Sequence, residues 1–200
     1  MAEGAKELLK ALYEIGSLAE NCMLHLQTAF IYNSVSPLNN CYESIEIIKN
    51  KEPELTKRLT ELARTDQSLK PYISVPVHYL RISENMEKLS ELINKKIKED
   101  ILFSDKAVME ITFLFERLMD MLKPVSDLIL AKNIILSKYV QESESGVVKN
   151  ANEYATLHEE RLIEGLCLPF ASAIYINMLD AIKNIAWHAK EIAVKIVSQT

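Results

Sequence analysis

The stretch that decides the fold is VPVHYLRISENMEKLSELI, residues 75–93, because its apolar pattern recurs in MLDAIKNIAWHAKEIAVKI, residues 178–196. In both stretches the apolar residues follow one another at alternating steps of four and three. The two series are Val75, Tyr79, Ile82, Met86, Leu89, Ile93 and Met178, Ile182, Ile185, Ala189, Ile192, Ile196, at a constant offset of 103. Such steps keep one stripe of a helix turned toward a partner helix. The recurrence predicts a duplicated helical unit.

The rest of the chain has the same helical character. Six long helices are expected, near residues 5–33, 37–65, 69–100, 104–129, 136–164 and 169–197. Ser104 is expected to cap the start of the fourth helix, and Gly165 the end of the fifth. Pro53 is expected to kink or restart the second helix. Short connections favour antiparallel neighbours, so we expect an all-α fold of two tandem three-helix bundles, residues 1–101 and 102–200.

Composition limits the classes of function. The chain has 200 residues, a net charge of −5 and only 4 glycines. An acidic balance argues against a nucleic-acid partner, which would favour a basic face. No apolar run approaches the ~18 residues of a membrane span, and the N-terminus lacks the apolar core of a secretion signal. Cys22, Cys41 and Cys167 are odd in number and widely spaced, so we expect reduced thiols in a cytoplasmic protein.

Two stretches carry a family likeness. They read VPVHYLRISENMEKLSELINKKIKEDILFSDKAVMEITFLF (75–115) and YATLHEERLIEGLCLPFASAIY (154–175), the latter followed by NMLDAIKNIAWHAKEIA (177–193). Both resemble PhoU, the phosphate-uptake regulator, and the PhoU-like domains attached to sodium–phosphate cotransporters. The resemblance covers nearly the whole chain and is strongest from 75 to 193. It implies two tandem three-helix bundles and a regulatory, non-enzymatic role. The implied partner is a phosphate transporter or its sensor, and contact with the membrane is expected only through that partner.

The sequence departs from the metal chemistry of this family. PhoU proteins often carry a Glu/Asp-x-x-x-Asp motif in the third helix of each bundle, where it binds metal ions, often iron. Those places hold Leu80 and Glu84 in the first half, and Lys183 and Trp187 in the second. Only Glu84 remains as a ligand of the type that hard cations prefer. We therefore expect no resident cofactor, and a divalent or ferric metal at low occupancy at most.

The same positions predict a contact surface. At about 100° per residue, Leu80 and Glu84 lie nearly opposite Ile82 on their helix, and Trp187 points away from Ile185. An apolar residue on an outward stripe indicates a contact with a partner. We expect Leu80 and Trp187 to mark the partner surface, and we expect a homodimer. The alternative is that the neighbouring bundle covers Trp187 within the chain.

Other polar residues leave alternatives open. Glu52 and Glu144 interrupt the core steps beside a helix breaker, where a solvated kink is the simpler interpretation. His78 could join Glu84 in a residual metal site, although a lone histidine on a helix is more often hydrogen-bonded or solvated. Cys167 and His158 could form a nucleophile and base, but their spacing does not specify it.

The competing functions are therefore few. The first is a regulatory interaction protein of phosphate transport, and the alternative is a metal-binding helical sensor or storage protein. An enzyme with a di-metal site would need inward Glu-x-x-His pairs, which the sequence lacks.

Overall fold

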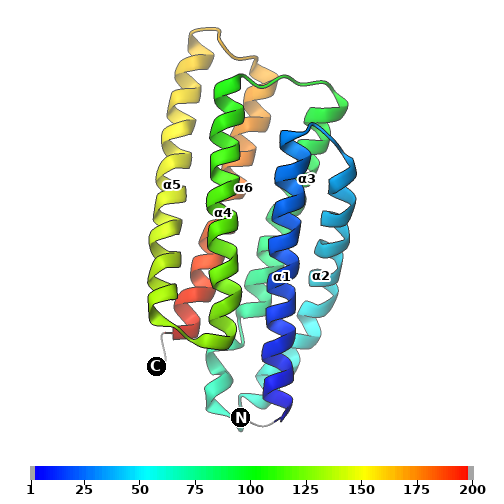
Figure 1. Cartoon of the computed structure of the whole chain (residues 1–200), viewed down its shortest axis with the longest axis vertical. Coiled ribbons are helices and arrows are strands. Elements are labelled where there is room, and N and C mark those ends of the chain that lie inside the picture. Colours follow the sequence, from blue (N-terminus) through cyan, green and yellow to red (C-terminus); the bar gives the residue numbers. More distant parts are fainter. Residues whose placement is uncertain (1–2, 198–200) are drawn as a thin grey trace.

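The computed structural model describes residues 3–197 as six α-helices and one short 3₁₀ helix, with no strand among these residues. The elements are α1 (Glu3–Ile31), α2 (Ser36–Leu62), η1 (Gln67–Tyr72), α3 (Val75–Lys98), α4 (Asp105–Ala131), α5 (Ile134–Ile163) and α6 (Pro169–Val197). The long helices run along the longest axis of the molecule, and successive helices are antiparallel (Figure 1). The prediction of an all-α fold is confirmed.

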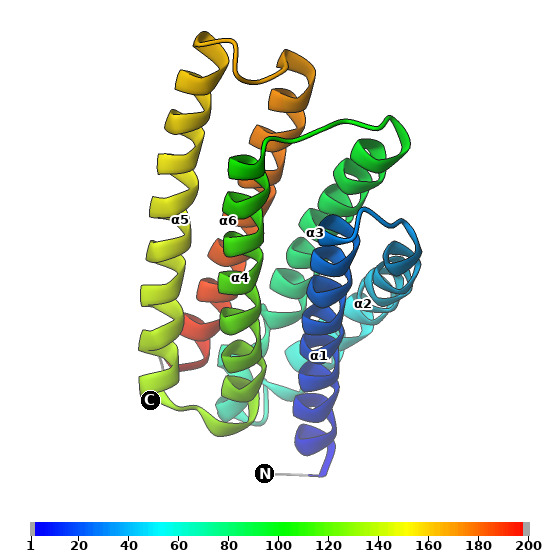
Figure 2. The same cartoon turned by 45° about the horizontal axis from the view of Figure 1, so that its top comes forward.

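The two sets of three helices lie side by side (Figures 1 and 2). Helix α1 packs on α4, and α3 packs on α6, so these four helices occupy the centre while α2 and α5 lie at the outer edges. The buried apolar side chains form one continuous core across both halves. The expected division at residue 101 falls in the connection between α3 and α4.

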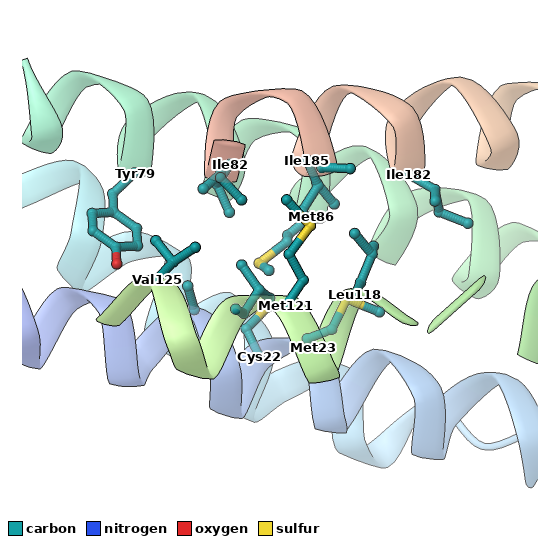
Figure 3. Packing of buried hydrophobic residues seen from close by; sticks show 14 of the residues in the cluster. Cys22, Met23, Tyr79, Ile82, Met86, Leu118, Met121, Val125, Ile182 and Ile185 are labelled. Carbon is teal, nitrogen blue, oxygen red and sulfur yellow. The ribbon is translucent and has the colours of Figure 1, made fainter. Parts of the chain in front are cut away.

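The repeated apolar seam forms the middle of this core. All twelve residues of the two series are buried. Figure 3 shows Tyr79 and Ile82 of α3 with Ile182 and Ile185 of α6, turned toward the layer formed by α1 and α4. Burial of this apolar surface is the main driving force that holds the halves together.

Polar contacts and one close approach also join the halves. The Ser126 hydroxyl of α4 donates to the Glu20 carboxylate of α1 at 2.6 Å. The Tyr72 hydroxyl donates to the carbonyl oxygen of Ile129 at 3.1 Å. At Gly16 of α1, an added Cβ would lie 2.5 Å from Ser126 Oγ and 2.6 Å from Tyr79 Oη. A side chain larger than that of glycine would force Ser126 or Tyr79 to move, so Gly16 lets α1 approach α3 and α4 closely.

Helix ends agree with the expected caps, with one correction. The Ser104 hydroxyl accepts from the Ala107 amide at 3.2 Å, and Gly165 has a φ of 74°. The third helix, however, does not begin near 69, because 67–72 is a separate 3₁₀ turn and α3 begins at Val75. Pro76 sits in the first turn of α3, where a missing amide proton costs nothing. Pro53 lies inside α2, which continues through it.

A charge-swapped pair of contacts marks the duplication. Lys49 of α2 binds Glu87 of α3 at 2.7 Å, whereas Glu144 of α5 binds Lys190 of α6 at 3.3 Å. Glu87 and Lys190 are counterparts at the offset of 103. The expectation of a solvated Glu144 is wrong, because its side chain is only 12% exposed and pairs with this lysine. Glu52 is half-buried and accepts from the Thr56 hydroxyl at 2.7 Å.

The cysteines require a second correction. Cys22 of α1 and Cys41 of α2 form a disulfide, and their Cα atoms are 4.3 Å apart. Both are fully buried, and only Cys167 is free among the described residues. The expectation of three reduced thiols is wrong for the first two. Their 19-residue separation hides the pairing, because stripes on two antiparallel helices bring them together.

Candidate functional site

The candidate site is the outward surface where α3 and α6 run beside each other, on the side away from α1 and α4 (Figure 1). We call it the α3/α6 face. Its residues are Val77, Leu80, Arg81, Glu84, Asn85, Asn184, Trp187 and His188. The Asn184 side-chain amide donates to Oδ1 of Asn85 at 3.3 Å, which joins the two helices across the seam.

The residues that were expected on this surface differ in their exposure to solvent. Trp187 is 44% exposed and Val77 is 38% exposed. Leu80 is half-buried. Lys183, which also lies at one of the four expected motif positions, pairs with Asp180 of its own helix at 3.0 Å. Trp187 is therefore the principal apolar group that this face presents to solvent.

Glu84, the one carboxylate at the four expected motif positions, already has a partner. Its carboxylate accepts from the Arg81 guanidinium at 2.8 Å, one turn back on α3. Both side chains are more than one third exposed, so this pair adds little to stability. Among residues 3–197, no group of three or more His, Cys, Asp or Glu side chains is placed to hold a metal ion.

A partly buried series of hydrogen bonds crosses the seam beside Trp187. His78 of α3 and His188 of α6 face each other with their Nδ1 atoms 3.1 Å apart. The Lys195 ammonium donates to His78 Nε2 at 2.9 Å. An ammonium can only donate, so neutral His78 carries its proton on Nδ1 and donates it to His188. The order of donation is therefore Lys195 to His78 to His188.

This arrangement disfavours the charged form of both histidines. Burial, Lys195 and His188 together lower the pKa of His78 to about 4. Burial and the nearby Arg81 guanidinium lower the pKa of His188. Both imidazoles are consequently neutral near pH 7, which matches the hydrogen-bond order.

Trp187 packs against the His188 end of this series of hydrogen bonds. Its ring lies 4.7 Å from the His188 ring, edge to face, and 6.2 Å from the His78 ring on the other bundle. The neighbouring bundle thus contacts part of the indole, while 44% of the residue stays exposed. Trp187 therefore packs partly against the neighbouring bundle and is partly exposed to solvent.

The sequence singled out His78 but missed its partners. His188 and Lys195 lie 110 and 117 positions after His78, not 103, so the duplication did not predict the pairing. A usable signal existed, since His78 and His188 each directly precede a seam residue, Tyr79 and Ala189. Residues next to a seam lie at the edge of the helix contact and reach across it.

The chemistry of this face suits binding. Its neutral histidines are occupied with each other, and the carboxylate of Glu84 is occupied by Arg81. What stays exposed is an indole, a valine and charged side chains at the margin. An exposed aromatic group with a polar margin is typical of protein interfaces.

One solved structure establishes the kind of fold. The crystal structure of PhoU from Pseudomonas aeruginosa superposes with a TM-score of 0.87 and covers 98% of each chain, at 15% sequence identity. The chain has a PhoU-like fold. No family model and no curated protein sequence matches the chain.

Glu84 of α3 and Trp187 of α6 are counterparts at the offset of 103 between the two halves. At 15% identity the likeness concerns the fold alone. Among the described residues of this PhoU-like chain, no helix is both long and apolar enough to span a bilayer.

Proposed function

We propose that this protein is a regulatory interaction protein of phosphate transport. It binds a phosphate transporter or the sensor associated with it, and modulates uptake. The PhoU-like fold over 98% of the chain carries this proposal. The sequence phrases at 75–115 and 154–175, which resemble the phosphate-uptake regulators, support it independently of the superposition.

The proposed partner surface is the α3/α6 face, with Trp187 of α6 as its most exposed apolar residue and Leu80 of α3 as a second member. Trp187 is 44% exposed, and it is held in place by the His188 ring on one side. A large apolar side chain with a fixed orientation loses little entropy on binding, and such anchors can contribute ~2 kcal/mol or more. The partner is a protein, and the site of action is the cytoplasm.

A binding role without catalysis and without a resident metal cluster is part of the proposal. Glu84 is one carboxylate where the family motif has four, and Arg81 neutralises it. Too few oxygen ligands remain for a hard cation. Elemental analysis of protein purified without chelators is the test. Stoichiometric iron or zinc that survives dialysis and is lost in Glu84→Gln would support a metal-binding sensor instead.

Phosphate uptake in cells tests the main proposal. Deletion of the gene is expected to change phosphate uptake, and the wild-type chain is expected to restore it. Trp187→Ala is expected to fail in restoration and in co-purification with the transporter or sensor, at an unchanged Tm. Tyr139→Ala is the matched control, because Tyr139 is an aromatic residue of 43% exposure on α5. Unchanged uptake on deletion would refute the proposal.

Self-association uses the same variants. The expected homodimer is measured by light scattering at several concentrations. If Trp187→Ala abolishes the dimer but leaves uptake intact, the α3/α6 face joins two copies and does not bind the transport machinery. Loss of stability together with intact association would place Trp187 in the internal packing.

A further inference from the structure

A cavity of about 230 Å³ opens at the end of the second bundle, where α4 begins and the α5–α6 connection passes over it. It shares no residue with the α3/α6 face. Most of its wall is apolar. It comes from the α3–α4 connection, the α5–α6 connection and the first turns of α4 and α6. These wall residues are Leu102, Phe103, Ala107, Leu166, Leu168 and Ala171.

The entrance of the cavity is unusually apolar. Leu102 is 74% exposed, Leu166 65% and Leu168 66%. Leucines that expose so much surface side by side are uncommon on a monomer and indicate a binding region. An apolar molecule that enters the cavity removes part of this surface from water, which favours its binding.

A buried charge cluster supports the inner wall of the cavity. Glu110 of α4 has a side chain that is 2% exposed, and Arg161 of α5 binds it through two hydrogen bonds of 3.0 and 2.8 Å. The Tyr175 hydroxyl of α6 donates to the same carboxylate at 2.5 Å. Burial and Glu110 raise the pKa of Tyr175 far above its usual range. The carboxylate charge is thus balanced by the guanidinium, and its oxygens accept three bonds.

His158 contacts both the charge cluster and the cavity. The residue is 3% exposed, lines the cavity, and its ring stacks on that of Tyr175 at 4.3 Å. Its Nδ1 atom faces an Arg161 nitrogen at 3.5 Å and the Cys167 sulfur at 4.0 Å. The guanidinium can only donate, so Nδ1 accepts and the proton of the neutral ring is on Nε2. Burial and Arg161 lower the pKa of His158, which keeps the ring neutral.

The Nε2–H group of His158 then has no acceptor. Nε2 is buried, and no protein atom bonds to it. The Arg161 Nε atom is also buried, and no protein atom forms a hydrogen bond with it. The cluster therefore has more donors than acceptors, and a buried donor without a partner calls for a bound oxygen.

We propose that this cavity binds a small apolar molecule that carries a neutral acceptor oxygen, such as the carbonyl of a ketone, ester or amide. The apolar wall holds the body of the molecule, and His158 Nε2–H donates to its oxygen. A carboxylate is disfavoured because the apolar wall would strip its charge of water, while the Arg161 guanidinium is already paired with Glu110. An ammonium is disfavoured because it adds a donor to a cluster that lacks acceptors. This site is independent of the proposed role in phosphate transport.

Three probes with eight carbon atoms test the charge preference: 2-octanone, octanoate and octylammonium. Binding is measured by ligand-detected NMR and by protection of Cys167 from alkylation, since this free thiol lines the cavity. We expect 2-octanone to bind and to protect the thiol, and the two charged probes to bind about tenfold more weakly or worse. No binding of 2-octanone up to its solubility, or equal binding of the three probes, would overturn the proposal.

Variants test the donor directly. His158→Phe keeps an aromatic ring for stacking but removes the N–H group, and it is expected to weaken 2-octanone binding about tenfold. His158→Gln keeps a donor and is expected to retain most of the affinity. Ala171→Leu fills the cavity without touching the charge cluster and is expected to abolish binding, which covers the case in which His158→Phe does not fold. Unchanged affinity in Ala171→Leu would show that the probe binds elsewhere and would refute the site.

Discussion

Acidification should weaken the contact between the two bundles through His78. This residue is 9% exposed and lies between Lys195 and His188 of the other bundle. A proton added to His78 would place a second positive charge 2.9 Å from the lysine ammonium. The fold therefore disfavours protonation, and the pKa falls from 6.5 to about 4. A depressed histidine pKa means that the unfolded chain binds more protons between these two values, so stability falls as the pH drops through that window.

The size of the effect follows from the same two pKa values. Near pH 7 both states are largely neutral, and the contribution is close to zero. Near pH 5 the unfolded imidazole is mostly charged while the folded one is mostly neutral, which costs about 2 kcal/mol of unfolding free energy relative to pH 7. The full loss, below the folded pKa, would approach about 3 kcal/mol. His188 adds to this loss, since its pKa is also lowered.

Urea unfolding of wild type and His78→Gln at several pH values measures the effect. The glutamine is neutral throughout, so the variant should lose about 2 kcal/mol less than wild type between pH 7 and pH 5. His25→Gln, which removes a half-buried histidine on α1 away from the contact between the bundles, controls for the loss of one imidazole. If wild type and His78→Gln lose the same free energy over this range, the inferred burial of a neutral His78 against Lys195 is wrong.

Further expectations concern the core, the buried charges and the cysteines. Gly16→Ala should destabilise the chain by about 1–3 kcal/mol in urea unfolding, because its Cβ meets buried side chains of α3 and α4. Gly146→Ala should instead stabilise α5 by up to about 1 kcal/mol, because no atom outside its own helix lies within 4 Å of the new Cβ; a loss of similar size in both variants would contradict the packing described for α1. Arg161→Ala should cost about 3–5 kcal/mol by leaving the Glu110 carboxylate buried and unpaired, so an unchanged Tm would argue against that burial. Thiol titration of the denatured chain should count one thiol, Cys167, without reductant and three with it; three in both conditions would refute the disulfide.

The sequence by itself determined the helices and the faces that they bury. A seam with steps of four and three can be satisfied only by a helix that packs along its length, and its recurrence at 103 residues implied two like units. Capping residues such as Ser104 and Gly165 act within one turn of their own helix, so the local sequence is enough to predict them. The predicted start of the third helix is wrong because residues 67–72, with Pro71 among them, form the separate 3₁₀ turn η1 before α3 begins at Val75.

The sequence also predicts the outward position of Trp187, because that position follows from the angle between neighbouring residues on one helix. The exposure of Leu80 was overestimated, because an outward angle does not say how far flanking side chains cover a residue. The status of both as a partner surface stays a prediction.

Tertiary structure alone decided the polar pairings. His78 with His188, Glu110 with Arg161 and Cys22 with Cys41 join residues on different helices, 110, 51 and 19 positions apart. Local spacing specifies which way a side chain points from its own helix. It does not specify the axial register of one helix against another, and a shift of one turn, about 5.4 Å, would separate every one of these pairs. That register is set by the packing of the whole apolar core, which no short segment of the chain contains.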